Sequence, residues 1–376
     1  MTVTLAGTED HPQARMVLST ALASGQPSHA YLFHGPAGTG KRTVARAFAA
    51  ELLAEGSDDP DAVRTRVMHG AHPDLTWVRP SGAHVMRVDD VEGPVVNAAT
   101  RTPFEARRRV FVLERVDPMN DEVANRLLKT LEEPASYVHL ILMTDQLGRV
   151  LETVVSRCQL VRFEPLPAAT IASQLVAEGV PAERAEACAR LALGNAARAR
   201  YLASADGEQL RADVEGLVVA ALSGGSVEDP EPWRPLLARA EAQGLAAEEA
   251  VADEAKRRLE LEPKGRERRA LEREFEEAAK RDGRRAMRES LELSLILAVL
   301  TFRDLVCLVQ DAADAVMAVD RIERLSAAAA GRDPAALRAA AERCEDVRQS
   351  LELNVSEDLA LAALGFRLTE LAGAPA

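Results

Sequence analysis

The chain has 376 residues, of which 47% are hydrophobic and 28% charged, so it is long enough for more than one domain and has the composition of a folded globular protein. Its formal net charge is −13, which argues against a protein that grips DNA unaided, because phosphate contacts come from Lys and Arg. We therefore expect protein partners. Only 3% of the residues are aromatic, and Ala, Leu, Glu and Arg dominate, a mixture that favours helices.

Cysteine usage and hydropathy predict a cytoplasmic protein without membrane contact. The cysteines lack any CxxC spacing, so neither a disulfide framework nor a zinc site is predicted; they are Cys158, Cys188, Cys307 and Cys344. The longest apolar segment, residues 291–309, is interrupted by three charged residues. We interpret it as a buried helix, because a bilayer span needs roughly 18–20 uncharged residues.

Strands and helices alternate over the first 165 residues. Helices are predicted near residues 14–22, 42–55, 88–100 and 122–131, and strands at residues 30–33, 72–78, 109–113 and 138–144. This alternation is typical of a parallel α/β sheet.

After Pro167 only helical periodicity remains, with breaks near residues 206–207 and 223–225. A charged stretch, residues 256–288, mixes both signs at helical spacing, which favours a solvated helix over a DNA-facing one. We expect an α/β plus all-α protein with three domains. These are an α/β nucleotide-binding domain at 1–166, a small helical lid at 167–208 and a helical C-terminal domain at 209–376.

A glycine-rich loop between a predicted strand and a predicted helix matches the pattern GxxxxGK. It reads Gly35, Pro36, Ala37, Gly38, Thr39, Gly40 and Lys41. Glycines let backbone N–H groups face an anion at a helix N-terminus, and the lysine reaches the β and γ phosphates. The pattern predicts bound ATP or ADP, and the alternative is a glycine-rich turn with a chance lysine.

Two positions argue against efficient hydrolysis. Arg42 replaces the Ser or Thr that ligates magnesium, and Thr43 is rotated by about 100° around the helix. Glu114, after the strand at 109–113, either holds the metal position or simply caps the strand. Arg115 follows where a general base is needed, and a guanidinium stays protonated. Magnesium binding should be weak or absent.

Several strings resemble, in matching order, the AAA+ clamp-loader family of bacterial DNA polymerase III. They are residues 29–33, the loop at 35–41, His72-Pro73-Asp74, LLKTLEEP at 127–134, and Ser156-Arg157-Cys158. The resemblance covers about residues 8–205 and is nearest to the delta-prime branch, with gamma/tau as the close relative. Relatives with a four-cysteine zinc module differ from this chain, because residues 52–71 contain no cysteine.

The resemblance implies a rigid, non-motor subunit of a five-membered ring that loads a sliding clamp onto primed DNA. Its partners would be the gamma/tau and delta subunits, and its C-terminal domain would join the collar of the ring. Arg157 would be an arginine finger reaching the ATP of a neighbour, where a lone arginine would otherwise suggest a surface ion pair. Thr144 and Arg198 would be nucleotide sensors, or else a strand end and an ordinary arginine.

Two other functions stay open at this point. One is an ATP-hydrolysing motor subunit of the gamma/tau kind, against which Arg115 argues. The other is a P-loop kinase or nucleotide-regulated switch, which would leave the Ser156-Arg157-Cys158 triplet unexplained.

Overall fold

The computed structural model describes residues 5–81, 86–224, 231–259, 265–351 and 355–372. The chain divides into two compact units, residues 1–167 and 168–376.

Five parallel strands form the sheet of the first unit in the order β2-β3-β4-β1-β5. Their bounds are β1 Ala30–His34, β2 Leu75–Val78, β3 Arg109–Leu113, β4 Val138–Thr144 and β5 Gln159–Arg162. β1 lies between β4 and β5, with Leu32 opposite Leu142 and Leu160. All five strands therefore end at the same edge of the sheet, which the predicted α/β class requires.

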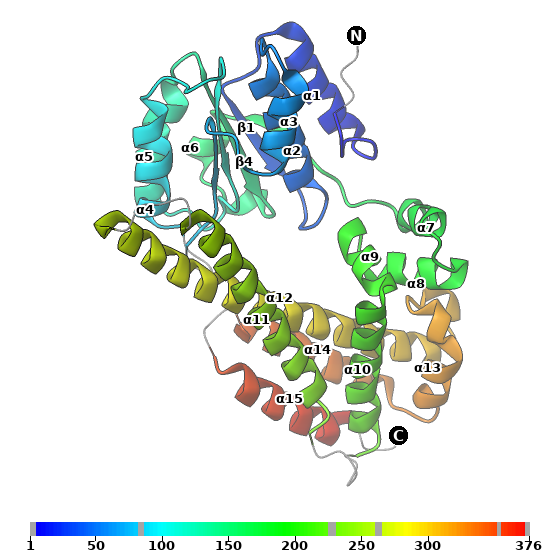
Figure 1. Cartoon of the computed structure of the whole chain (residues 1–376). Helices are drawn as coiled ribbons and strands as arrows, with labels where there is room; N and C mark the ends of the chain where they lie inside the picture. The colour runs from blue at the N-terminus through cyan, green and yellow to red at the C-terminus, as the bar shows by residue number, and fades with distance from the viewer. Residues whose placement is uncertain (1–4, 82–85, 225–230, 260–264, 352–354, 373–376) are drawn as a thin grey trace. The chain divides into compact units, whose positions relative to one another are not determined.

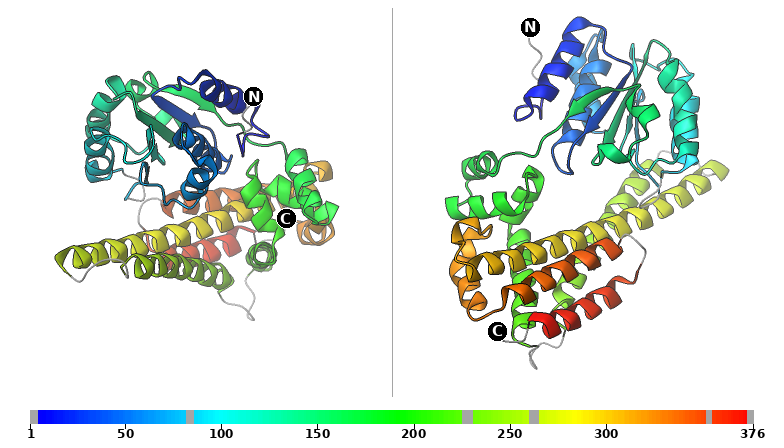
Figure 2. Two further views of the ribbon diagram at one scale, coloured as in Figure 1. Left: turned by 45° about the horizontal axis from the view of Figure 1, so that its top comes forward. Right: turned by 180° about the vertical axis from the view of Figure 1, so that it is seen from behind.

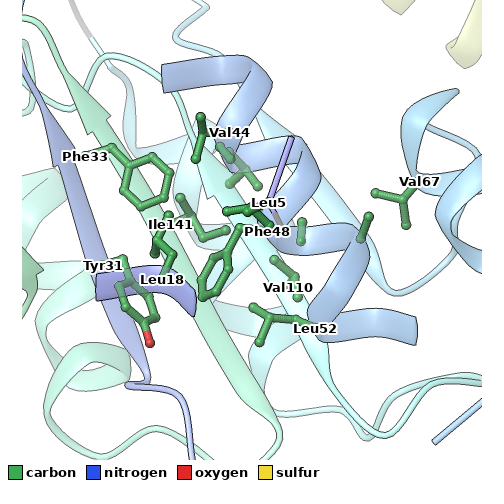
Figure 3. Close-up of a cluster of buried hydrophobic side chains, with 14 of the residues drawn as sticks. Leu5, Leu18, Tyr31, Phe33, Val44, Phe48, Leu52, Val67, Val110 and Ile141 are labelled. Carbon is green, nitrogen blue, oxygen red and sulfur yellow. The ribbon is translucent and has the colours of Figure 1, made fainter. Parts of the chain in front are cut away.

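Side chains of β1, β3 and β4 alternate between two buried clusters, one on each face of the sheet. Tyr31 and Phe33 face the cluster formed with α1 (Pro12–Ser24), α2 (Lys41–Ala54) and α3 (Pro60–Met68). The opposite cluster packs under four short or medium elements, which are α4 (Val88–Val91), the π-helical turn Glu92–Asn97, α5 (Asp121–Glu132) and α6 (Glu152–Val155). Figure 1 shows these helices on the two faces, and Figure 3 shows the first cluster around Phe48.

The second unit contains only helices in the ranges that the structure describes. The α-helices are α7 (Ala168–Ala177), α8 (Ala182–Leu191), α9 (Ala196–Ala203), α10 (Ala205–Leu222), α11 (Arg234–Leu259), α12 (Arg266–Val309), α13 (Ile322–Ala329), α14 (Pro334–Ser350) and α15 (Glu357–Ala372), and two 3-10 helices, Ala313–Ala315 and Val319–Arg321, precede α13. α12, α14 and α15 lie side by side (Figure 2). The all-helical part of the predicted fold class is thereby confirmed.

A close crossing joins α11 and α12 into a hairpin. A Cβ built on Gly244 would lie 3.0 Å from the carbonyl oxygen of Gly283, and one on Gly283 would lie 2.4 Å from the side chain of Glu248. Glycine at both positions lets the two helices approach. The predicted charged stretch begins in the last turn of α11. Its part from Arg266 onward is continuous with the apolar segment in one helix, α12, which carries ion pairs such as Arg268 with Glu272.

Contacts link the start of the second unit to its later helices. Arg190 Nη1 on α8 donates to the carbonyl oxygen of Val316 at 2.8 Å, and Arg211 on α10 pairs with Asp320 at 2.5 Å. The predicted boundary at residue 166 lies one residue from the end of the first unit, and the one at residue 208 falls within α10. A lid separate from the C-terminal domain stays a prediction.

We predict that Gly35→Ala destabilises the first unit. Gly35 has φ +141°, and an added Cβ would lie 1.9 Å from the carbonyl oxygen of Phe163. Overpacking and left-handed strain together should lower the free energy of unfolding by about 2–4 kcal/mol, measured by denaturant unfolding. Gly25→Ala is the matched control, because Gly25 has φ +65° and no atom within 4 Å of the added Cβ. Equal losses in the two variants would contradict the steric explanation.

A second prediction concerns acid stability. His139 is buried, its Nδ1 donates to the carbonyl of Ser28, and its Nε2 accepts from Arg108 at 2.9 Å. Burial lowers the pKa of His139 to about 4, below the usual 6.5. Between these values only the unfolded chain takes up the proton, so stability present above pH 6.5 is lost as the pH falls toward 4.

The unfolding free energy of the wild-type chain should fall between about pH 7 and pH 5, and in His139→Gln this fall should be smaller by about 2 kcal/mol. The exposed residue His69 provides the control His69→Gln, which should keep the wild-type pH dependence. An unchanged pH dependence in His139→Gln would exclude His139 as its source.

Candidate functional site

The glycine-rich loop connects β1 to α2 at the carboxyl edge of the sheet, in the strand–loop–helix setting that the sequence predicts. Gly38 and Gly40 have φ of 77° and 85°, a left-handed backbone that glycine adopts readily. α2 begins at Lys41, directly after Gly40. Its first turn therefore presents unsatisfied backbone N–H groups to an anion.

Lys41 is folded back onto the loop. Its Nζ donates to the carbonyl oxygens of Gly35 and of Pro36, the latter at 2.7 Å, and pairs with Asp145 Oδ1 at 2.7 Å. Burial lowers the pKa of Lys41, and Asp145 opposes that shift. Asp145 follows β4, the neighbour of β1, and the sequence analysis missed it, although an acidic residue directly after a buried strand is a recognisable signal.

Two threonine hydroxyl groups form hydrogen bonds in and beside the loop. Thr39 is buried, and its hydroxyl donates to the carbonyl oxygen of Pro36 at 2.9 Å. The hydroxyl of Thr144, at the end of β4, donates to Asp117 Oδ1 at 3.1 Å and accepts the Gln146 N–H at 3.0 Å. Thr144 is thus held at the carboxyl edge beside Asp117, and its role as a sensor stays a prediction.

Arg42 joins a cluster of cations around one carboxylate. Arg42 Nε and Nη2 each lie 2.9 Å from Glu114 Oε1, at the end of β3. Arg79 Nε, just after β2, lies 3.2 Å from the same oxygen, and the indole N–H of Trp77 donates to it as well. The guanidinium of Arg46 lies 4.7 Å from the centre of the Trp77 ring. Arg46, Trp77 and Arg79 were not among the residues predicted for the site.

Magnesium, which the loop motif implies, does not fit these residues. The hydroxyl ligand is replaced by Arg42, and the carboxylate of Glu114 is in contact with two guanidinium groups, which repel a divalent cation. The Thr43 methyl group lies against Gly7, where an added Cβ would be 3.1 Å away.

Arg115 occupies the position that a water-activating carboxylate would need. Its backbone has φ 53°, which is uncommon for a residue other than glycine. A guanidinium there cannot accept a proton from water. The loop therefore combines backbone N–H groups and a lysine that suit an anion, but the position next to Glu114 supplies no general base.

Arg157 lies two residues after the end of α6, on the surface of the first unit. Its Nη1 donates to the carbonyl oxygen of Thr153 at 2.8 Å, and its Nη2 pairs with Glu132 on α5 at 2.5 Å. Its side chain is 34% exposed, so the guanidinium remains accessible from outside the chain. Its predicted role as an arginine finger is not tested by this geometry.

Arg198 belongs to the second unit, on the first turn of α9. Asn195 caps this helix by accepting the Arg198 backbone N–H at 2.9 Å, and burial lowers the pKa of the Arg198 side chain. Its predicted role as a second sensor stays a prediction.

The cysteines are all free thiols, and burial raises the pKa of Cys158 and Cys344 to about 12.

Within the described ranges, no helix is both long and apolar enough to cross a membrane.

Sequence comparison relates the first unit to known replication proteins. Residues 10–167 match the family described as DNA polymerase III, delta subunit. The DNA polymerase III subunit delta' of Bacillus subtilis is 32% identical over 187 residues, which are 49% of this chain and 56% of that protein. The delta' subunit of Pseudomonas aeruginosa is 36% identical over 187 residues, 48% of this chain and 56% of its own.

The gamma/tau subunit of Mycobacterium tuberculosis is 33% identical over 163 residues, 42% of this chain and 28% of that protein. A solved structure of a gamma subunit-related protein from Thermotoga maritima aligns with 94% of this chain and 99% of its own, at 15% identity and a TM-score of 0.46. The chain thus spans about half the length of the delta' relatives it matches. Residues 10–167 are therefore similar to the DNA polymerase III delta-subunit family.

Proposed function

We propose that this chain is the non-motor subunit of a bacterial clamp loader. In this proposal it works in the cytoplasm with gamma/tau and delta subunits to place the sliding clamp on primed DNA. Its Arg157 would complete the ATP site of a neighbouring motor subunit, while its own loop keeps ATP or ADP without efficient turnover. The names of its relatives, delta' above all, support this role.

The observation that carries the proposal is the contrast between two arginine sites. At the chain's own loop, Arg42 covers Glu114, and Arg115 stands where a general base is required. Arg157, in contrast, is accessible on the surface and held by one carboxylate, Glu132. A guanidinium offers a fixed fork of donors that suits a γ phosphate, and it works in trans when a second chain brings the nucleotide.

A motor subunit of the gamma/tau kind is the rival function, because such subunits are also among the relatives. It would need a metal ligand after Lys41 and a carboxylate after Glu114. Arg42 and Arg115 occupy those two positions, so the non-motor role accounts better for the site.

We predict that the purified chain alone does not turn over ATP. Without a general base or a fitted metal, hydrolysis should stay at the background of a heat-inactivated sample, measured by phosphate release. The control is a gamma/tau subunit prepared in the same way. Robust, saturable turnover by this chain alone would show that it is a motor.

Arg157→Ala should leave the fold intact but slow hydrolysis in the reconstituted complex. Loss of an arginine finger costs on the order of 10³-fold or more at the site it serves. In a complex with several ATP sites, only the site that Arg157 serves should lose activity. The total DNA-stimulated ATP turnover, measured with clamp and primed DNA present, should therefore fall by that site's contribution. Arg157→Lys should also fail, because an ammonium lacks the planar fork.

The matched control is Arg149→Ala, since Arg149 is exposed in the same surface segment and its guanidinium donates to the side chain of Gln146 at 3.5 Å. Thermal unfolding should be the same for all three variants. Unchanged ATP turnover in a folded Arg157→Ala complex would remove the arginine-finger role.

A further inference from the structure

We infer that the loop at residues 35–41 binds a nucleoside di- or triphosphate without magnesium, with the guanidinium groups of Arg42 and Arg79 in the role of the divalent cation. This inference rests on the nucleotide binding included in the proposed function. It names the form of the ligand, which is the metal-free polyphosphate.

The local charge favours an anion over a cation. Arg42 and Arg79 both contact the carboxylate of Glu114, so this side of the site carries two positive charges and one negative charge. Arg46 adds a third guanidinium: its pKa is lowered by burial and then by the charges of Arg79 and Arg42. Arg42, Arg79 and Arg46 therefore carry three positive charges against the one negative charge of Glu114, and a bound polyphosphate would reduce their mutual repulsion.

The position of Arg42 matches the function it would take over. It directly follows Lys41 on the first turn of α2, where a P-loop normally carries the hydroxyl that binds magnesium. Its side chain is 59% exposed and that of Arg79 is 43% exposed, so both guanidinium groups are accessible to a ligand. Each can donate two parallel hydrogen bonds to phosphate oxygens.

The other carboxylates near the loop are already engaged. Asp145 is paired with Lys41 at 2.7 Å, and Asp117 accepts the hydroxyl of Thr144 at 3.1 Å. A magnesium ion would have to separate Asp145 from Lys41 to use it. Phosphate, in contrast, would release Lys41 from the loop carbonyls by offering its ammonium a stronger acceptor.

The test is calorimetric titration of the full chain with ADP, in buffer with EDTA and in buffer with magnesium chloride. Wild-type affinity should be the same in both buffers within about twofold. Arg42→Thr should bind ADP about 10- to 100-fold more weakly in EDTA, because a charge-assisted pair is lost, and magnesium should restore part of the affinity. Arg101→Thr changes an exposed arginine elsewhere in the same unit and should behave like wild type.

Wild-type binding that requires magnesium would overturn the inference, and its loss in Asp145→Asn would place the metal on that carboxylate instead. Equal affinity of wild type and Arg42→Thr in EDTA would also overturn it. Absence of ADP binding in both buffers would overturn it together with the nucleotide part of the proposed function. The Arg157 experiment on the reconstituted complex is independent of all these outcomes.

Discussion

Parallel pairing of the five strands is the constraint on which the candidate site depends. Because every strand runs the same way, the residues that follow β1, β2, β3 and β4 meet at one edge of the sheet. The loop at 35–41, Arg79, Glu114 and Asp145 are far apart in sequence and each follows a different strand. The register of the sheet brings these residues into contact, and the two buried clusters fix the sheet against the helices on its two faces.

The elements that the sequence predicted best are the buried, mostly apolar strands. β3 and β4 begin and end where predicted, because both are buried along almost their whole length. β5 was missed because it is an edge strand, with Leu160 exposed and only Val161 buried. Arg79 and Asp145 were not predicted for another reason. Arg79 contacts Glu114 and Asp145 contacts Lys41 across neighbouring strands, and a local sequence pattern carries no information on such contacts.

Two adjacent cations on the first turn of α2 have opposite environments. One step along a helix rotates a side chain by about 100°, so Lys41 and Arg42 face different neighbours. Lys41 is 6% exposed and contacts the loop carbonyls and Asp145, whereas the side chain of Arg42 is 59% exposed and contacts Glu114. An arginine in place of a Ser or Thr at residue 42 therefore leaves the contacts of Lys41 unchanged. It removes a metal ligand and adds a charge where the metal charge would lie.

In the proposed function, the chain keeps a phosphate loop without the chemistry that such loops usually serve. A bound polyphosphate needs backbone N–H groups and cations, and both are present at Gly40, Lys41 and Arg42. Hydrolysis needs in addition a positioned base and a positive charge that stabilises the negative charge developing in the transition state. In the proposed function that second requirement is met between chains: the exposed Arg157 contributes to the reaction at a neighbour's site.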